Sequence, residues 1–208
     1  MNIEPNTYLV TQANQSRNRS TLDVVEAAVE GGVDVVQLRE KHATARERYA
    51  LAREVRAVTA AGDVPFVVND RVDIAAAADA DGVHLGDDDL PVSVARDYLG
   101  EDAIVGRSVS SVGGARRAVD AGADYLGVGA VFETSSKDVD GTIGVETVRH
   151  VAAAVDVPLV GIGGITPQNA ADVVDAGADG VAVVSAITAA DDPTRATRDL
   201  AAAVAEVK

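Results

Sequence analysis

The sequence contains no cysteine, which excludes small scaffolds held by disulfides and enzymes that use a thiolate nucleophile. Aromatic residues make up only 3% of the chain, so the core must be built from Val, Ile, Leu and Ala. A chain of 208 residues can bury such a core in one domain, and single α/β barrels reach this size. We therefore expect residues 1–208 to form one domain.

Long apolar runs are also missing. None approaches the ~20 residues that a membrane helix needs, and the N-terminus shows no basic region followed by an apolar run, as a signal peptide would. We expect a soluble, cytoplasmic protein without a membrane partner. The net charge of −15 argues against nucleic acid as a partner, because the phosphate backbone is itself negative.

Lysine is scarce, with three lysines against 15 arginines, 23 aspartates and 10 glutamates. Dispersed aspartate with so little lysine favours a salt-loving source, since a Debye length of ~3 Å at ~1 M salt screens surface repulsion. An ordinary acidic protein is the alternative.

Lys208 ends the chain, whereas Lys41 and Lys137 follow predicted strands. Because an ammonium is a compact point charge that suits phosphate, we expect these two lysines to bind an anion.

Eight short runs rich in β-branched residues recur along the chain. Most are apolar on successive residues, which is typical of strands buried on both faces of a parallel sheet. The predicted strands span residues 7–12, 33–40, 65–70, 82–86, 103–109, 125–131, 158–165 and 180–187. Alanine-rich stretches with helical spacing lie between them, including residues 21–32, 44–62, 91–100 and 166–177.

Glycines stand where several predicted helices should stop, namely Gly31, Gly62, Gly100, Gly122 and Gly177. The tetrapeptide AGAD occurs at 121–124 and again at 176–179, each time between a helix and a strand. Strands and helices that alternate eight times predict a single (β/α)8 TIM barrel. A doubly wound open sheet is the alternative, but no GxGxxG follows the first strand.

Acidic residues follow two predicted strands, at the end of a TIM barrel where active sites lie. Asp70 follows the third strand, and Asp87, Asp88 and Asp89 follow the fourth. Hard oxygen ligands from two strand ends suit Mg²⁺, which usually keeps several waters and also binds substrate phosphate. Taken alone, the run GDDD is more typical of a solvated turn. Its combination with Asp70 favours a metal site, and which of the three aspartates would bind stays open.

Positive charge gathers at the same predicted end of the barrel. Arg39 and Lys41 follow the second strand, and Lys137 follows the sixth. Beside a metal, such groups hold a diphosphate and stabilise its charge as it leaves. A structural ion pair with Glu40 or Asp70 is the alternative for Arg39.

Glycine and serine follow the last two predicted strands, as Gly163-Gly164 and Val184-Ser185. These loops are the usual phosphate-binding place in TIM barrels, because glycine lets backbone N–H groups approach an anion. A glycine in a strand can also mark a bulge. A metal-bound diphosphate at one side and a phosphate at the other describe a two-substrate transferase with a diphosphate leaving group. We interpret His84 as a packed residue rather than a nucleophile's base.

These motifs resemble thiamine-phosphate synthase over nearly the whole chain. VVQLREK resembles the family's QLREK signature, and NDRVDIAAAADADGVHLGDDD resembles its ND…ADGVHLGQED segment. GRSVSS, DYLGVGAVFETSSK, VGIGGIT and GADGVAVVSAI match in order and spacing. The family joins hydroxymethylpyrimidine diphosphate to thiazole phosphate with Mg²⁺, and releases thiamine phosphate and diphosphate. The resemblance implies the same activity here.

The resemblance also implies roles for individual residues. The pyrimidine diphosphate would be bound by Gln37, Arg39, Lys41, Asn69, Ser108 and Lys137, with Leu38 and Glu40 from the same second-strand motif. The thiazole phosphate would be held by Thr134, Ser135, Ser136, Gly164, Val184 and Ser185. Asp70 and Asp89 would bind Mg²⁺, and the catalytic residues would be Arg39, Lys41, Ser108 and Lys137.

Some positions depart from the family pattern. The family's glutamine after the fourth-strand glycine is replaced by Asp87 in this sequence. The family's TxTK motif corresponds to TSSK at residues 134–137. A related thiazole tautomerase, a non-transferring isomerase, is one alternative. Its catalytic histidine would fall at Ser110, which cannot shuttle protons near neutral pH as histidine can. A phosphate-binding barrel without catalysis is another, but it would be expected to have lost the acidic and lysine positions.

Overall fold

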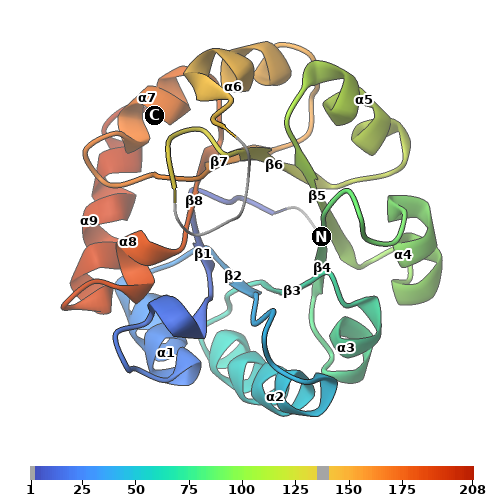
Figure 1. Ribbon diagram of the computed structural model, residues 1–208, viewed down its shortest axis with the longest axis vertical. Coiled ribbons are helices and arrows are strands. Elements are labelled where there is room, and N and C mark those ends of the chain that lie inside the picture. Colours follow the sequence, from blue (N-terminus) through green and yellow to red (C-terminus); the bar gives the residue numbers. More distant parts are fainter. Residues whose placement is uncertain (1–2, 135–140) are drawn as a thin grey trace.

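The computed structural model describes residues 3–134 and 141–208. The described strands form a closed parallel barrel in the order β1 to β8, and β8 pairs with β1. Figure 1 shows this barrel surrounded by helices. The strands are β1 Thr7–Val10, β2 Val35–Leu38, β3 Phe66–Asn69, β4 Gly82–Leu85, β5 Ile104–Val109, β6 Tyr125–Gly129, β7 Leu159–Ile162 and β8 Gly180–Val183. The predicted (β/α)8 TIM barrel is therefore confirmed, and the open sheet is excluded.

The helices follow the strands, and α1, α2, α5 and α9 begin after a residue whose side chain caps them. Ser20 and Thr44 each accept a hydrogen bond from the third backbone N–H of the following helix and complete a capping box. The helical elements are η1 Ala13–Gln15, α1 Thr21–Gly31, α2 Ala45–Ala61, α3 Val72–Ala77, α4 Val92–Leu99, α5 Val112–Asp120, α6 Gly144–Ala152, α7 Ala170–Asp175, α8 Ser185–Thr188 and α9 Pro193–Ala205.

Most of the strands and helices are shorter than the predicted ranges, and two boundaries differ in kind from the sequence prediction. The eighth strand ends at Val183, and the residues expected to extend it form α8 instead, which begins at Ser185. The apolar run continues because α8 also buries Ile187, so composition alone did not mark the change. At the end of α1, the left-handed cap is Gly32 with φ +87°, one residue beyond the predicted Gly31.

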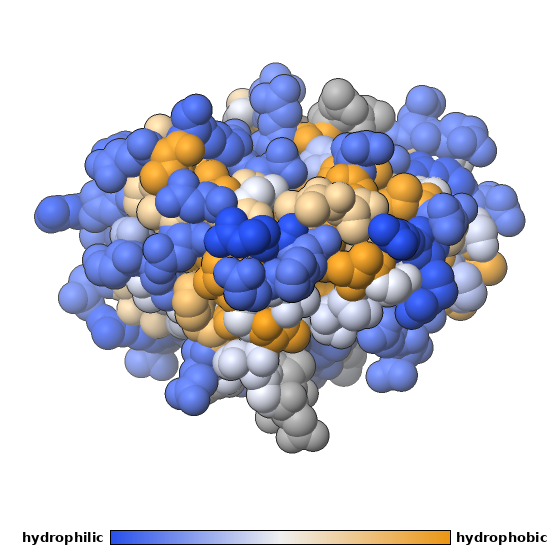
Figure 2. Space-filling view, turned by 90° about the horizontal axis from the view of Figure 1, so that it is seen from above, coloured by the Kyte–Doolittle hydropathy of each residue, from blue (hydrophilic) through white to orange (hydrophobic). Residues whose placement is uncertain are grey.

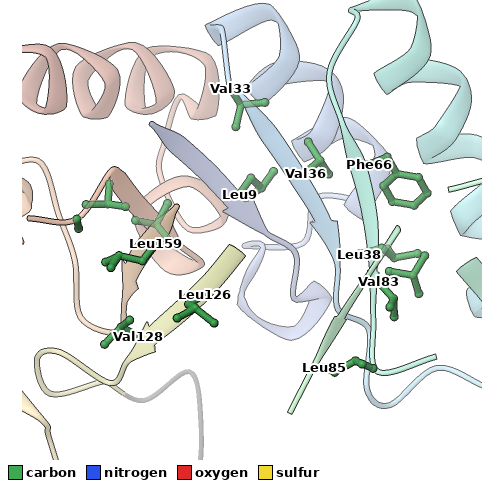
Figure 3. Packing of buried hydrophobic residues seen from close by; sticks show 14 of the residues in the cluster. Leu9, Val33, Val36, Leu38, Phe66, Val83, Leu85, Leu126, Val128 and Leu159 are labelled. Atoms are coloured by element: carbon green, nitrogen blue, oxygen red, sulfur yellow. The ribbon is translucent and has the colours of Figure 1, made fainter. Parts of the chain in front are cut away.

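The strands are buried on both faces, as their continuous apolar runs predict, and this produces two cores. The larger core lies between the barrel and the helices and contains apolar side chains from both. Figure 3 shows some of the strand residues of this core, among them Leu9, Val36 and Leu126. The smaller core fills the barrel interior and contains Tyr8, Val35, Val67 and Tyr125. Ile3 joins this interior core, so the N-terminal segment runs across one end of the barrel (Figure 1).

Four aspartates repeat one contact around the opposite end of the barrel from the expected active site. Each stands directly before an even-numbered strand and accepts a backbone N–H from the preceding odd-numbered strand, while its own N–H donates to the carbonyl of that same residue. The accepted bonds are Thr7 to Asp34 at 2.8 Å, Phe66 to Asp81 at 2.8 Å, Val105 to Asp124 at 2.6 Å and Leu159 to Asp179 at 2.8 Å. This aspartate clasp gives the αβ loops a structural role.

Hydrophilic side chains cover most of the lateral face in Figure 2, with apolar patches between them. Leu90, Val94 and Tyr98 are among the large apolar side chains exposed to solvent. None of the helices in residues 3–134 and 141–208 combines the length and apolar character that crossing a bilayer requires.

Candidate active site

A cavity of about 470 Å³ opens at the carboxyl ends of the strands, where polar residues were predicted to gather. Much of its wall comes from the ends of β5 to β8 and the loops that follow them (Figure 1). The predicted site residues that line it are Arg39, Ser108, Thr134, Gly164, Val184 and Ser185. A neighbouring cavity of about 320 Å³ shares Asp87 and residues 108–110 with it and also contacts Asp89.

Two carboxylates meet beside these cavities. Asp70 directly follows β3 and adopts a left-handed backbone with φ +65°, which a residue other than glycine keeps only where its surroundings hold it. Asp89 lies in the turn after β4, where its Oδ2 accepts a 2.6 Å hydrogen bond from the Gly86 N–H. Burial, and then its hydrogen bond with Asp70, raises the pKa of Asp89 above the usual range. Electrostatic repulsion between the two carboxylates acts in the same direction, and a cation between them would relieve it.

The three aspartates of the GDDD turn have different surroundings. Asp87 is 86% exposed and pairs with Arg107 at 2.9 Å, and Asp88 is exposed. Asp89 is the one of the three that contacts Asp70. Among the described residues, no group of three or more His, Cys, Asp or Glu side chains is placed to hold a metal ion. Two carboxylates fit a hard cation that takes its other ligands from water and phosphate.

Two cationic side chains stand next to the carboxylates. The Nζ of Lys41 lies 3.1 Å from Oδ2 of Asp70. Arg39 lines the cavity, and its Nη1 donates a 2.8 Å hydrogen bond to Oε1 of Gln12. Burial lowers the pKa of Arg39, against the opposing effects of Asp70 and Glu40. The buried Nε of Arg39 has no partner in the part of the chain that the structure describes, and such a donor costs about 1–3 kcal/mol until a ligand accepts from it.

The loop after β7 brings backbone close to the cavity. Gly163 and Gly164 have φ values of +105° and +64°, and a Cβ on Gly164 would lie 2.4 Å from the carbonyl oxygen of Glu133. Only glycine fits such a position without displacement of the backbone. Asn169 holds the loop by donating a 3.1 Å hydrogen bond to the Gly164 carbonyl. After β8, Ser185 lines the same cavity as the first residue of α8.

Other predicted site residues lie deeper in the barrel. Gln37 is buried, and its Nε2 donates a 2.7 Å hydrogen bond to the Tyr8 hydroxyl. Asn69 is buried at the end of β3. Ser108 faces the cavity from β5, and its Oγ lies 2.9 Å from Nε2 of His84.

Leu38 and Glu40 lie apart from the cavity wall. Leu38 is fully buried in the core between barrel and helices. Glu40 is buried as well, and its two carboxylate oxygens accept hydrogen bonds of 2.9 Å from the Ala13 N–H and the Thr21 hydroxyl. The side chain of Glu40 therefore ties the end of β2 to the η1–α1 segment. Three further predicted residues, Ser135, Ser136 and Lys137, lie outside the described residues.

Sequence reasoning missed two tyrosines. Tyr8 and Tyr125 are fully buried inside the barrel, and their hydroxyls lie 2.7 Å apart. Their presence within otherwise aliphatic strands is a signal, because a buried tyrosine hydroxyl needs a polar partner. His84, interpreted as packed, is buried against Tyr125, with Nδ1 2.9 Å from its hydroxyl.

Together, the fold and the cavity define a TIM-barrel protein with a cavity at the carboxyl ends of its strands, where active sites of this fold lie. The family model described as thiamine monophosphate synthase matches residues 7–187. A thiamine-phosphate synthase of Natronomonas pharaonis is 66% identical over 95% of this chain and 94% of its own length, and one of Haloquadratum walsbyi is 61% identical over 98% and 93%. A solved structure of thiamine phosphate pyrophosphorylase from Pyrococcus furiosus has a TM-score of 0.88 at 40% identity, covering 98% of both chains.

The chain therefore belongs to the thiamine-phosphate synthase family, and it is an enzyme. The resemblance recognised in its motifs is confirmed over nearly the full length. The two relatives named above come from halophilic archaea, in agreement with the expectation drawn from dispersed aspartate and scarce lysine.

Proposed function

We propose that this enzyme joins hydroxymethylpyrimidine diphosphate to thiazole phosphate, forming thiamine phosphate and diphosphate, and that Mg²⁺ supports the reaction. The observation that carries the proposal is the division of the site. A carboxylate pair with two cations stands at one side, and a glycine loop stands at the other. The two sides lie close together, because the cavity beside the glycine loop and the cavity that contacts Asp89 share Asp87 and residues 108–110 in their walls.

The diphosphate belongs at the side of Arg39 and Lys41. Arg39 offers a buried Nε donor without a partner among the described residues, and Lys41 offers an ammonium 3.1 Å from Asp70. Both groups favour a ligand of high negative charge. Sequence places Lys137 in the same role. Gln37, Asn69 and Ser108 would contact the pyrimidine.

Mg²⁺ fits the pair Asp70 and Asp89. Burial is the main cause that raises the pKa of Asp89, and the hydrogen bond with Asp70 and repulsion from it act in the same direction. A hard divalent cation prefers carboxylate oxygens. When bound, the ion would neutralise charge on the diphosphate. The two carboxylates supply too few ligands for a closed site, which leaves positions for water and phosphate oxygens.

The phosphate of the thiazole belongs at the other side of the cavity. There the N–H groups of Gly163 and Gly164 can approach an anion without a Cβ in the way, and Ser185 adds a hydroxyl. Thr134 lines the same wall. Ser135 and Ser136 are proposed here from sequence alone.

The reaction exchanges one bond for another. The bond between the pyrimidine methylene carbon and the diphosphate oxygen breaks, and its electron pair leaves with diphosphate. The lone pair of the thiazole nitrogen then forms the new carbon–nitrogen bond. Arg39 and Lys41 stabilise the charge that develops on the leaving oxygen. Because this charge is larger in the transition state than in the bound substrate, the two residues raise the reaction rate and not only the affinity for substrate. The cavity brings the two reactants together in one orientation.

One assay tests this function directly. The purified protein is incubated with both substrates and Mg²⁺, and thiamine phosphate is measured. We expect product with Mg²⁺ and none with excess chelator. Asp70→Ala should lower kcat by at least ~10²-fold, because it removes a ligand of the ion beside the leaving group.

Asp88→Ala is the matched control, since Asp88 is an exposed carboxylate in the same acidic turn as Asp89. It removes the same charge and should leave kcat within about twofold. Full activity in excess chelator, or an equal loss in both variants, would contradict the proposed metal site. Isomerisation of a thiazole substrate without coupling would favour the tautomerase alternative instead.

A further inference from the structure

Five side chains form a continuous hydrogen-bond chain through the barrel interior, below the cavity. Each comes from a different strand: Gln37 from β2, Tyr8 from β1, Tyr125 from β6, His84 from β4 and Ser108 from β5. The successive contacts measure 2.7, 2.7, 2.9 and 2.9 Å. The chain connects two proposed pyrimidine-binding residues, Gln37 and Ser108, which lie on strands that are not neighbours.

The barrel makes room for this chain with two glycines. A Cβ on Gly106 would lie 2.2 Å from the ring of Tyr125, and one on Gly127 would lie 3.1 Å from Cε1 of His84. A side chain at Gly106 would therefore displace Tyr125 or the strand that carries it. The rings of Tyr125 and His84 pack with centroids 5.4 Å apart.

The placement of the Gln37 amide nitrogen against Tyr8, together with a neutral His84 ring, points to one assignment of hydrogens along the chain. With the amide nitrogen of Gln37 as donor, the Tyr8 oxygen accepts, and this assignment sends the Tyr8 hydrogen to the Tyr125 oxygen 2.7 Å away. A buried hydroxyl hydrogen without an acceptor would be costly. In the same assignment Tyr125 donates to Nδ1 of His84, and the hydrogen of the neutral His84 ring is on Nε2, which donates to Ser108. The hydroxyl hydrogen of Ser108 is left to point at a ligand in the cavity.

We propose that Tyr8, Tyr125 and His84 are positioning residues that fix Ser108 as a hydrogen-bond donor toward the pyrimidine diphosphate. The ligand atom that fits this donor is an acceptor, a ring nitrogen or a phosphate oxygen. The proposal rests on the proposed function for the identity of that substrate. The direction of the chain does not depend on it.

The direction is tested by ¹⁵N NMR of the histidine rings in the protein without substrate. The chain contains three histidines, and His42 and His150 are exposed, so His84→Gln assigns the buried ring by loss of its signals. We expect the ring hydrogen of His84 to be on Nε2 and Nδ1 to be unprotonated. A His84 ring with its hydrogen on Nδ1 would reverse the chain and overturn the proposal, whatever reaction the enzyme catalyses.

The positioning role is tested by a double-mutant cycle. Tyr125→Phe removes the hydroxyl in the middle of the chain and keeps the ring, and we expect kcat/KM for coupling to fall at least ~10-fold. Tyr98→Phe removes the same atom from a side chain that is 64% exposed and should change little. In a Ser108→Ala background, Tyr125→Phe should have no further effect, because it acts through Ser108.

Additive losses in the double variant would mean that Tyr125 supports the barrel without positioning Ser108, and this would overturn the proposal. The ¹⁵N spectrum of Tyr125→Phe adds a readout that general destabilisation would not produce. Nδ1 of His84 loses its donor there, so the single form seen in wild type should give way to a mixture of both ring forms. If the protein showed no coupling activity at all, the proposed function would be wrong, but the spectra would still determine the direction of the hydrogen-bond chain.

Discussion

Lys41 and Asp70 form an ion pair between the ends of β2 and β3, with Nζ 3.1 Å from Oδ2. The lysine is half exposed, so it can leave the carboxylate without a large cost of desolvation. Asp70 would then be able to hold a metal ion, and the ammonium of Lys41 would contact the diphosphate. The pair keeps both charges at the site in the absence of ligand.

The raised pKa of Asp89 predicts a conflict between stability and metal binding. Because folding raises the pKa of this carboxyl, the folded protein holds its proton more tightly than the unfolded chain does. The free energy of unfolding of the metal-free protein should therefore lose this contribution as pH rises from the ordinary aspartate pKa of ~3.9 through the raised value. Asp89→Asn should raise the melting temperature at pH 7 and abolish binding of Mn²⁺, measured by electron paramagnetic resonance.

In wild type, Mn²⁺ affinity should fall as pH is lowered, and it should begin to fall at a higher pH than an ordinary aspartate would cause. Asp88→Asn serves as the control, because Asp88 is exposed. A lower melting temperature for Asp89→Asn than for Asp88→Asn at pH 7 would contradict the predicted repulsion.

Removing one carboxylate of the aspartate clasp should lower the stability of the protein without a direct effect on catalysis. Asp81 accepts from the Phe66 N–H and from Arg56, and its side chain is only 14% exposed. Asp81→Ala leaves both donors without this acceptor and should lower the free energy of unfolding by about 2–3 kcal/mol. Urea unfolding measures this, with Asp97→Ala on the exposed face of α4 as the charge-matched control. Equal stability of the two variants would show that the clasp contributes nothing.

Salt should stabilise this protein. Its net charge of −15 produces self-repulsion that weakens as the Debye length shrinks from about 10 Å at 0.1 M to about 3 Å at 1 M salt. We expect the melting temperature to rise between dilute buffer and ~2 M KCl, as followed by circular dichroism. A flat or falling melting temperature would count against the salt-loving character expected from composition.

Lys137 provides a test of the transfer reaction. If its ammonium stabilises the departing diphosphate, Lys137→Ala should lower the rate of single-turnover thiamine phosphate formation by at least ~10²-fold. Lys137→Arg should recover only part of this rate, because a planar fork does not occupy the place of an ammonium.

The control is Lys208→Ala, which removes the C-terminal lysine that contacts Asn6 at the other end of the barrel. Coupling that is unaffected by Lys137→Ala would remove this residue from the site. Isomerisation of the thiazole by wild type without coupling would reverse the choice between synthase and tautomerase.

Much of the site could be predicted because a TIM barrel gathers the ends of all its strands in one place. Arg39, Asp70, Ser108, Gly164 and Ser185 each follow or end a strand that its apolar run made visible. Periodicity then placed them at one end of the barrel without any knowledge of contacts. The Ser185 boundary was less visible, since α8 continues the apolar run of β8 and local composition does not separate them.

The sequence by itself determined the fold and the family, because strand and helix patterns are local and the motifs stand in a fixed order. Residue type left open which aspartate joins Asp70, and the family resemblance pointed to Asp89. The tertiary structure places Asp89 against Asp70 and pairs Asp87 with Arg107 instead, because the turn directs the three side chains differently. It also decided that Tyr8 and Tyr125 meet, with hydroxyls 2.7 Å apart across 117 residues of chain. Contacts across the barrel interior depend on closure of the sheet, which no local pattern records.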